Sequence, residues 1–269
     1  MNNFDLKKFL IENKLTSNSK KLSEQEDPEV EKLKDLLKKD YDTFVRELGD
    51  NIKDPKFVQA IKTYADERPV QTASGAVGVS ALLPTQNEID VDKSLSYPLT
   101  NPGQLKGILD GGVQAPGGNA IVTGGGKYII DGHHRWSQVY VINPKAGIKA
   151  LDLTNIKTPS GGLKSAQLGI AGDIGKVPTQ SVQGSNLINI SKNELGEYIK
   201  NKIVPGSVEV FVEKKIAKDT NDIESIIEYI WKNVEMMQTK NAPVSGSPKR
   251  DIMPQTDTAS NWQDDAPAV

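Results

Sequence analysis

The fold around the candidate site depends on nine consecutive residues, Tyr128-Ile-Ile-Asp-Gly-His-His-Arg-Trp136. Its apolar start is typical of a buried strand, and the pair Asp131-Gly132 predicts a turn. From Trp136 onward, apolar residues recur every three or four positions, so we expect a helix that begins near His134. His133 and His134 are the two histidines of the chain, and both lie in this segment.

A strand, a glycine turn and a helix N-terminus together favour an anion-binding site. Gly132 lets backbone amides approach a ligand closely, and the free N–H groups and dipole of a helix start attract phosphate. Arg135 adds a guanidinium that can hold phosphate or carboxylate through two hydrogen bonds. The alternative is an Asp-Gly turn with solvated polar side chains. Because histidine is used nowhere else, anion binding is the better interpretation.

A metal site is the second hypothesis for this turn. Asp131, His133 and His134 are suitable ligand types, but adjacent side chains diverge and the chain contains no cysteine. We therefore expect no dedicated metal site and no zinc. A magnesium ion held by Asp131 or Glu88 together with substrate phosphates agrees better with these residues.

The neighbouring sequence predicts a small mixed sheet. Residues 120–123 and 127–130 read as strands joined by Gly124-Gly-Gly126, so we expect a hairpin. No Lys-Ser/Thr pair follows these glycines, which argues against a phosphate loop. Residues 148–153 predict a further strand, and residues 70–83 alternate small and apolar side chains ahead of a polar turn.

The flanks are predicted to be helical. Apolar periodicity predicts one helix over residues 28–48, and Ser191-Lys-Asn-Glu194 is a capping box that opens another. Residues 155–188 are rich in Gly, Ser, Thr and Gln, which favours a long, partly mobile loop. The expected parts of this α+β (α/β) protein are an N-terminal amphipathic segment and linker (1–27), a helical region (28–68), the mixed-sheet domain (69–155), a loop-rich and helical extension (156–237), and an extended or disordered tail (238–269).

Composition narrows the function classes. Hydrophobic residues make up 36% of the 269 positions, so we expect one ordered domain with poorly packed flanks. The 33 basic and 35 acidic residues give no argument for nucleic acid, although a local basic groove stays open. The lack of cysteine excludes disulfides and thiol nucleophiles. No apolar stretch is long enough to cross a bilayer, so we expect a soluble, cytoplasmic protein without a membrane partner.

The box Ile130-Asp-Gly-His-His-Arg135 resembles the signature turn of the ParB/sulfiredoxin superfamily, in which a strand–Gly–x–x–Arg–helix element binds nucleotide phosphates. It is also similar to the Asp-Gly-His-His-Arg box of free-serine kinases and to the Asp-Gly-Gln-Gln-Arg box of NTP-dependent restriction proteins. Upstream, Val77–Pro84, followed by Gln86 and Glu88, resembles the opening segment of this family. The resemblance covers residues 69–155.

The resemblance implies a nucleotide such as ATP, ADP or CTP with Mg²⁺, used for phosphoryl transfer, NTP hydrolysis or nuclease activity. Gln86 and the turn Gly132–Arg135 are then the phosphate-binding residues. His133 or His134 stabilises charge or moves a proton, Asp131 orients a histidine or a metal, and Glu88 is the candidate general base. His133 occupies the position of the sulfiredoxin cysteine, which excludes that activity. Chromosome partitioning is not expected, because no helix-turn-helix pair follows the box.

Two other function classes stay open: a nucleic-acid- or nucleotide-binding module without turnover, and a packaged phage head protein with a vestigial site. The first twelve residues, Met1–Glu12, resemble the leaders that direct internal head proteins of T-even-type phages into the capsid, with cleavage after Leu10-Ile11-Glu12. That reading places the protein in the host cytoplasm and then in the virion. The alternative is an N-terminal helix that docks on the protein itself. One hypothesis for the string Arg250–Asp257 is that it folds back over the domain, but the sequence suggests no chemistry for it.

Overall fold

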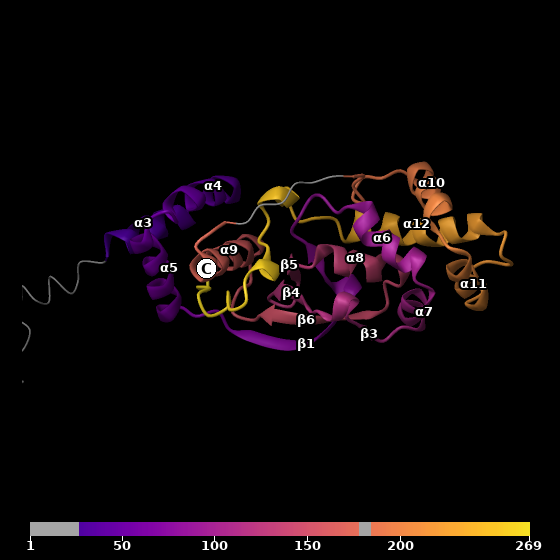
Figure 1. Ribbon diagram of the computed structural model, residues 1–269, viewed down its shortest axis with the longest axis horizontal. Coiled ribbons are helices and arrows are strands. Elements are labelled where there is room, and N and C mark those ends of the chain that lie inside the picture. Colours follow the sequence, from indigo (N-terminus) through magenta and orange to yellow (C-terminus); the bar gives the residue numbers. More distant parts are fainter. Residues whose placement is uncertain (1–26, 178–183) are drawn as a thin grey trace, which may run out of the picture.

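The computed structural model describes residues 27–177 and 184–269. The predicted leader and its cleavage point after Glu12 lie outside these residues. The described chain forms an α+β fold around one mixed sheet (Figure 1). The strand order is β1 (Thr72–Gly78), β6 (Gly147–Leu153), β4 (Ile121–Gly124), β5 (Tyr128–Asp131) and β2 (Leu83–Pro84), with β3 (Val113–Gln114) paired to β6.

The centre of the sheet agrees with the sequence prediction. Strands β4 and β5 pair antiparallel as the expected hairpin. Strand β6 runs parallel to β4 and antiparallel to β1, and β2 runs parallel to β5. The carboxyl end of β5, which carries the box, therefore lies beside the segment that follows β2. This pairing brings residues 84–90 and the box together.

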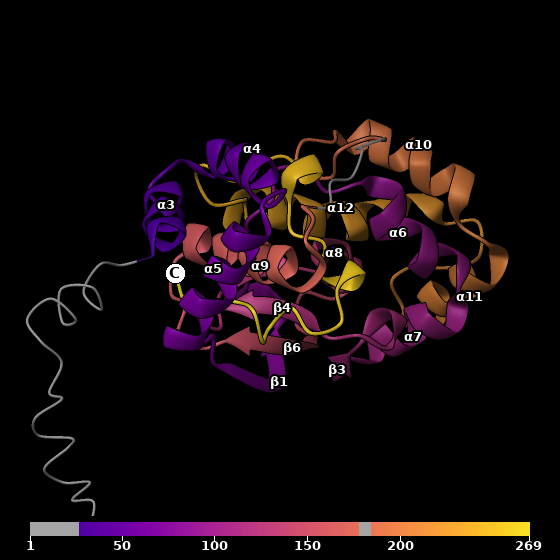
Figure 2. The same cartoon turned by 60° about the vertical axis from the view of Figure 1, so that its left-hand side comes forward.

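Both faces of the central strands β4 and β5 are buried, whereas β1 at the edge is largely exposed. Successive side chains of a strand point to opposite faces, so the two central strands contribute to two cores. Ile129 belongs to one hydrophobic core and Ile130 to the other. Ile121 and Val122 divide in the same way. Helices cover each face, as Figures 1 and 2 show.

The first core lies between the sheet and the helices on the α8 side. These are α6 (Val91–Thr100), α7 (Pro102–Asp110), α8 (His133–Ile142), α10 (Lys192–Lys202), α11 (Pro205–Glu213) and α12 (Ile223–Lys240). The second core lies on the α9 side. Its helices are α3 (Pro28–Leu37), α4 (Tyr41–Asn51), α5 (Pro55–Glu67) and α9 (Pro159–Ile174).

The single helix predicted over residues 28–48 is in fact two. Asp40 begins α4 by accepting a hydrogen bond from the Thr43 backbone N–H at 2.9 Å. The apolar periodicity runs through the break because α3 and α4 face the same core. Helices α6 and α11 were not predicted. Pro98 lies inside α6, and Pro205-Gly206 begins α11, so both segments carry residues typical of turns.

The prediction of a mobile loop over residues 155–188 is wrong for α9, a buried sixteen-residue helix. Its glycines look like loop residues, but they serve close packing. A Cβ atom at Gly169 would lie 2.2 Å from the Trp262 carbonyl oxygen, and one at Gly162 would lie 2.4 Å from Ile130 Cδ1. Residues 161–172 of α9 are all buried, so the helix lacks the contrast between an apolar and a polar face that reveals a helix in a sequence.

The C-terminal segment, residues 241–269, is extended and contains two 3-10 turns, Arg250–Ile252 and Thr256–Thr258. It runs between the two groups of helices and packs against α9 (Figure 2). Trp262 is 3% exposed and Ala266 is fully buried. The expectation of poorly packed flanks is therefore wrong for this segment and for helices α3 to α5. Within the described ranges, no helix is both long and apolar enough to span a membrane.

Candidate functional site

The box folds as the sequence predicts: β5 ends at Asp131, Gly132 turns the chain, and α8 begins at His133. Gly132 has φ 92° and ψ 26°, a left-handed conformation that favours glycine. A Cβ atom there would also lie 2.6 Å from Ile121 Cγ2. Both the backbone conformation and the space around it therefore require glycine at this turn.

The start of α8 carries unpaired backbone donors. Its first intrahelical hydrogen bond runs from the Trp136 N–H to the Gly132 carbonyl at 2.9 Å. Residues 133–135 precede that bond, so their N–H groups have no partner inside the helix. Gly132 has no side chain to cap them. The helix therefore offers amide donors and the positive end of its dipole at the box.

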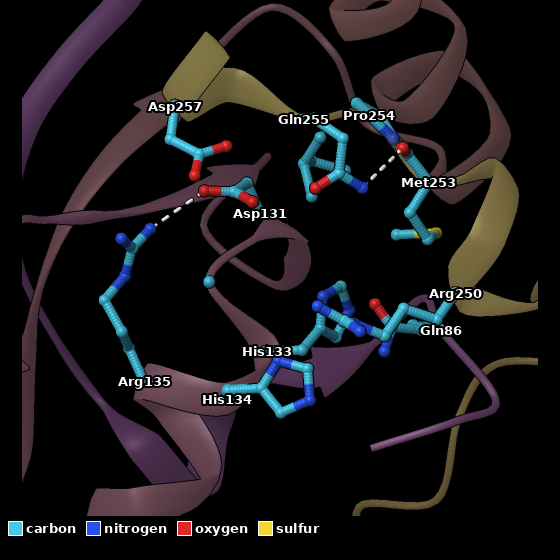
Figure 3. Close-up of a pocket in the computed structure, with 12 residues that line it drawn as sticks. Gln86, Asp131, His133, His134, Arg135, Arg250, Met253, Pro254, Gln255 and Asp257 are labelled. Carbon is cyan, nitrogen blue, oxygen red and sulfur yellow. Dashed lines mark hydrogen bonds and ion pairs between the residues drawn. The ribbon is translucent and has the colours of Figure 1, made fainter. Parts of the chain in front are cut away.

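A cavity of about 160 Å³ lies at this helix start (Figure 3). Its wall comes from three parts of the chain: the segment after β2, the box, and the C-terminal segment. The lining residues are Gln86, Ile130, Asp131, Gly132, His133, His134, Arg135, Arg250, Met253, Pro254, Gln255 and Asp257.

The two histidines are fixed by backbone amides of the segment after β2. The Thr85 N–H donates to His133 Nε2, and the Asp90 N–H donates to His134 Nε2, both at 3.1 Å. Because Nε2 accepts in each ring, the neutral imidazole carries its proton on Nδ1. Each histidine can thus offer one N–H donor to a ligand.

Burial lowers the pKa of His133 and of His134 to about 3. For His133 the neighbouring His134 and then Arg250 lower the pKa further, and for His134 Arg250 is the strongest of the nearby charges. Both rings are therefore neutral near pH 7 and act as hydrogen-bond donors. A bound anion would favour the charged form and raise both pKa values, so proton transfer by either ring depends on the ligand.

Arg135 is engaged by the acidic end of the box. Its Nη2 donates to Asp131 Oδ2 at 2.8 Å, and the Thr256 hydroxyl donates to the same oxygen at 2.8 Å. Arg135 Nε is buried and has no hydrogen-bond partner among the described residues. Asp131 thus orients an arginine and meets the C-terminal segment. The sequence predicted that Asp131 orients a histidine or a metal, but the side-chain partners of its Oδ2 are Arg135 and Thr256.

The predicted residues upstream lie beside the box. Gln86 lines the cavity, is 4% exposed, and donates its side-chain amide to the Glu88 carbonyl. The Glu88 carboxylate accepts the Arg250 backbone N–H at 3.0 Å and lies outside the cavity wall. Glu88 is therefore near the site, where it holds the C-terminal segment.

The sequence did not predict that the C-terminal segment supplies part of the wall. Arg250 is 8% exposed, and its guanidinium lies next to the imidazoles and Gln86 in Figure 3. Met253, Pro254, Gln255 and Asp257 complete that side. The signal available in the sequence was the charged, aromatic-free string Arg250–Asp257 inside a Pro/Ser-rich tail, which no single motif connects to the box.

The cavity wall can contribute to a metal site without completing one. Its carboxylates are Asp131 and Asp257. The described part of the chain contains no group of three or more His, Cys, Asp or Glu side chains placed to hold a metal ion. A magnesium ion bound here would take its remaining ligands from substrate phosphates and water, as this ion commonly does.

Comparison of the chain with protein-family models, curated proteins and solved structures finds no significant match. The function is therefore inferred from the geometry of the cavity and from the residues of the box.

Proposed function

We propose that the cavity at the start of α8 binds the phosphate group of a small molecule or nucleotide. The supporting observation is that donors converge at one end of the cavity: the first-turn amides of α8 and the neutral rings of His133 and His134. The acceptors Asp131 and Asp257 lie at the other end (Figure 3), where Arg135 neutralises Asp131. Such a donor-rich helix start in a concave site favours an anion.

The resemblance of the box to the ParB/sulfiredoxin superfamily supports the same chemistry. In this proposal the turn Gly132–Arg135 holds phosphate, as it does in that superfamily, and ATP, ADP or CTP with Mg²⁺ is the nucleotide to test first. Turnover would be phosphoryl transfer, NTP hydrolysis or nucleic-acid cleavage. Asp131 is then a better candidate base than Glu88, because its carboxylate lies in the cavity wall.

A second candidate function is binding without turnover. The observation that favours it is the state of Asp131, whose Oδ2 already accepts hydrogen bonds from Arg135 and Thr256. The histidines are held neutral by burial. A site in which Asp131 is engaged in this way can recognise a nucleotide or a nucleic-acid end without reacting with it.

Calorimetry of the full chain with orthophosphate and with ATP, each with and without Mg²⁺, tests the proposal. We expect Arg135→Ala to abolish measurable binding, because the variant loses a guanidinium and leaves the Asp131 charge uncompensated beside the anion. Removing a charge-assisted contact of this kind costs about 2–3 kcal/mol. Arg46→Ala, which removes the same charge from the exposed face of α4, is the control and should bind normally.

Product analysis on any bound nucleotide separates the two functions. Conversion that is lost in Asp131→Asn and kept in Glu88→Gln supports a catalytic site with Asp131 as base. Tight binding with no product supports the binding module. If neither phosphate nor ATP binds the full chain at millimolar concentration, the cavity is not a phosphate site.

A further inference from the structure

Hydrogen bonds on both sides of Arg250 hold the C-terminal segment beside the box. The Asn87 N–H donates to the Pro248 carbonyl at 3.1 Å, and Glu88 accepts the Arg250 N–H. Beyond Arg250, the Ile252 carbonyl accepts the Gln167 side-chain amide at 3.0 Å. These contacts come from the segment after β2 and from α9, so the backbone at Arg250 is fixed relative to both cores.

This anchoring places the Arg250 side chain at the donor end of the cavity. Its guanidinium lies beside the imidazoles and Gln86, whereas that of Arg135 turns toward Asp131 at the acidic end (Figure 3). The electrostatics agree, because Arg250 depresses the pKa of both histidines and acts on that of His134 more strongly than Arg135 does. An anion beside the two rings would therefore meet the positive charge of Arg250.

The same segment sets the size of the cavity. Met253, Pro254 and Gln255 form its wall opposite the box. The volume of about 160 Å³ is about half the lower limit of the roughly 300–1,000 Å³ common for drug-sized ligands. A phosphate group fits this space, whereas the ribose and base of a nucleotide would have to remain outside it.

We propose that the cavity takes a single phosphate group, free or at the end of a larger molecule, and that Arg250 from the C-terminal segment is the guanidinium that binds it. Arg135 then acts indirectly, by neutralising Asp131. This inference rests on the proposed phosphate-binding function and names both the size of the ligand group and its main charged contact.

The test compares orthophosphate affinities of point variants of the full chain. We expect Arg250→Ala to weaken binding roughly ten- to hundredfold, the effect of losing a charged hydrogen bond, and Arg250→Lys to recover part of this loss. Lys249→Ala removes the same charge one residue away at an exposed position and should bind normally. The double variant Asp131→Asn, Arg135→Ala should bind orthophosphate more tightly than Arg135→Ala alone, because it removes the carboxylate together with the cation that neutralises it.

The outcomes separate this inference from the proposed function. Normal affinity in Arg250→Ala, or a loss in the double variant as large as in Arg135→Ala alone, overturns the role of Arg250 while phosphate binding stands. Parallel titrations with glycerol 3-phosphate and ATP identify the source of the phosphate group. Affinities similar to that of orthophosphate support a one-phosphate site, and ATP binding more than about tenfold tighter overturns the size limit. No binding of any of the three to the full chain overturns both proposals.

Discussion

Replacing Gly169 by alanine tests how closely α9 and the C-terminal segment pack. The new Cβ atom would lie 2.2 Å from the Trp262 carbonyl oxygen and 2.8 Å from Ala266 Cβ. Neither neighbour is the end of a flexible side chain, so the segment must move away from the helix. In a loosely packed protein the same substitution would be stabilising, because alanine is the better helix former.

Overpacking and helix propensity have opposite effects on the stability of Gly169→Ala. Overpacking of a buried site costs about 1–3 kcal/mol, and contacts this short belong at the upper end of that range. The higher helix propensity of alanine returns about 1 kcal/mol. We therefore expect Gly169→Ala to lower the free energy of unfolding by about 2 kcal/mol, which is a fall in Tm of roughly 4–8 °C for a chain of this size.

Gly49→Ala is the matched control. Gly49 lies inside α4, and a Cβ atom there meets nothing within 4 Å. That variant should gain up to about 1 kcal/mol. Urea denaturation followed by circular dichroism measures the stability of both variants. If Gly169→Ala proves as stable as Gly49→Ala, the segment does not pack on α9 as described, and the cavity wall it forms loses its support.

Two further predictions concern buried polar groups. The free energy of unfolding should fall as the pH is lowered from 6.5 toward 4.5, by up to about 1.4 kcal/mol per pH unit for each histidine. The reason is that the unfolded rings take up protons, whereas the folded rings exclude them until about pH 3. Urea denaturation at several pH values should show a shallower pH dependence in His134→Gln, and an unchanged slope would contradict the buried neutral state. Lys164 donates to the Leu37 and Lys39 carbonyls at 2.6 Å each, so Lys164→Met should lose about 1–3 kcal/mol of stability. The control Lys157→Met, at an exposed position, should not lose stability. Equal stabilities of the two variants in calorimetry would show that Lys164 does not hold α3 to α9.

The part of the fold that could be predicted from the sequence is the part set by neighbouring residues. The hairpin of β4 and β5, the turn at Gly132 and the start of α8 follow from apolar runs, glycines and periodicity within about twenty positions. The capping box at Ser191 is equally local and is present as predicted.

What the sequence could not show depends on contacts between distant segments. The sequence predicted a loop in place of helix α9, because its glycines are explained only by the close approach of Trp262 and Ile130. The ion pair of Arg135 with Asp131 joins residues four positions apart across the turn, so it is a local contact as well. The place of Arg250 could not be predicted, since it is set by the Glu88 carboxylate 162 positions away and by α9.

The route of the C-terminal segment also bears on how the protein matures during translation. Arg135 and Gln255 line one cavity but are 255 − 135 = 120 positions apart. At about 5–20 residues per second, a ribosome needs roughly 6–24 s to pass from one to the other. During that interval the box has been synthesised without the wall that faces it, and α9, once made, lacks Trp262. A stalled or prematurely terminated chain would thus carry the whole Asp-Gly-His-His-Arg sequence and still have no closed cavity, and its uncovered α9 would be a surface for chaperones and proteases to recognise.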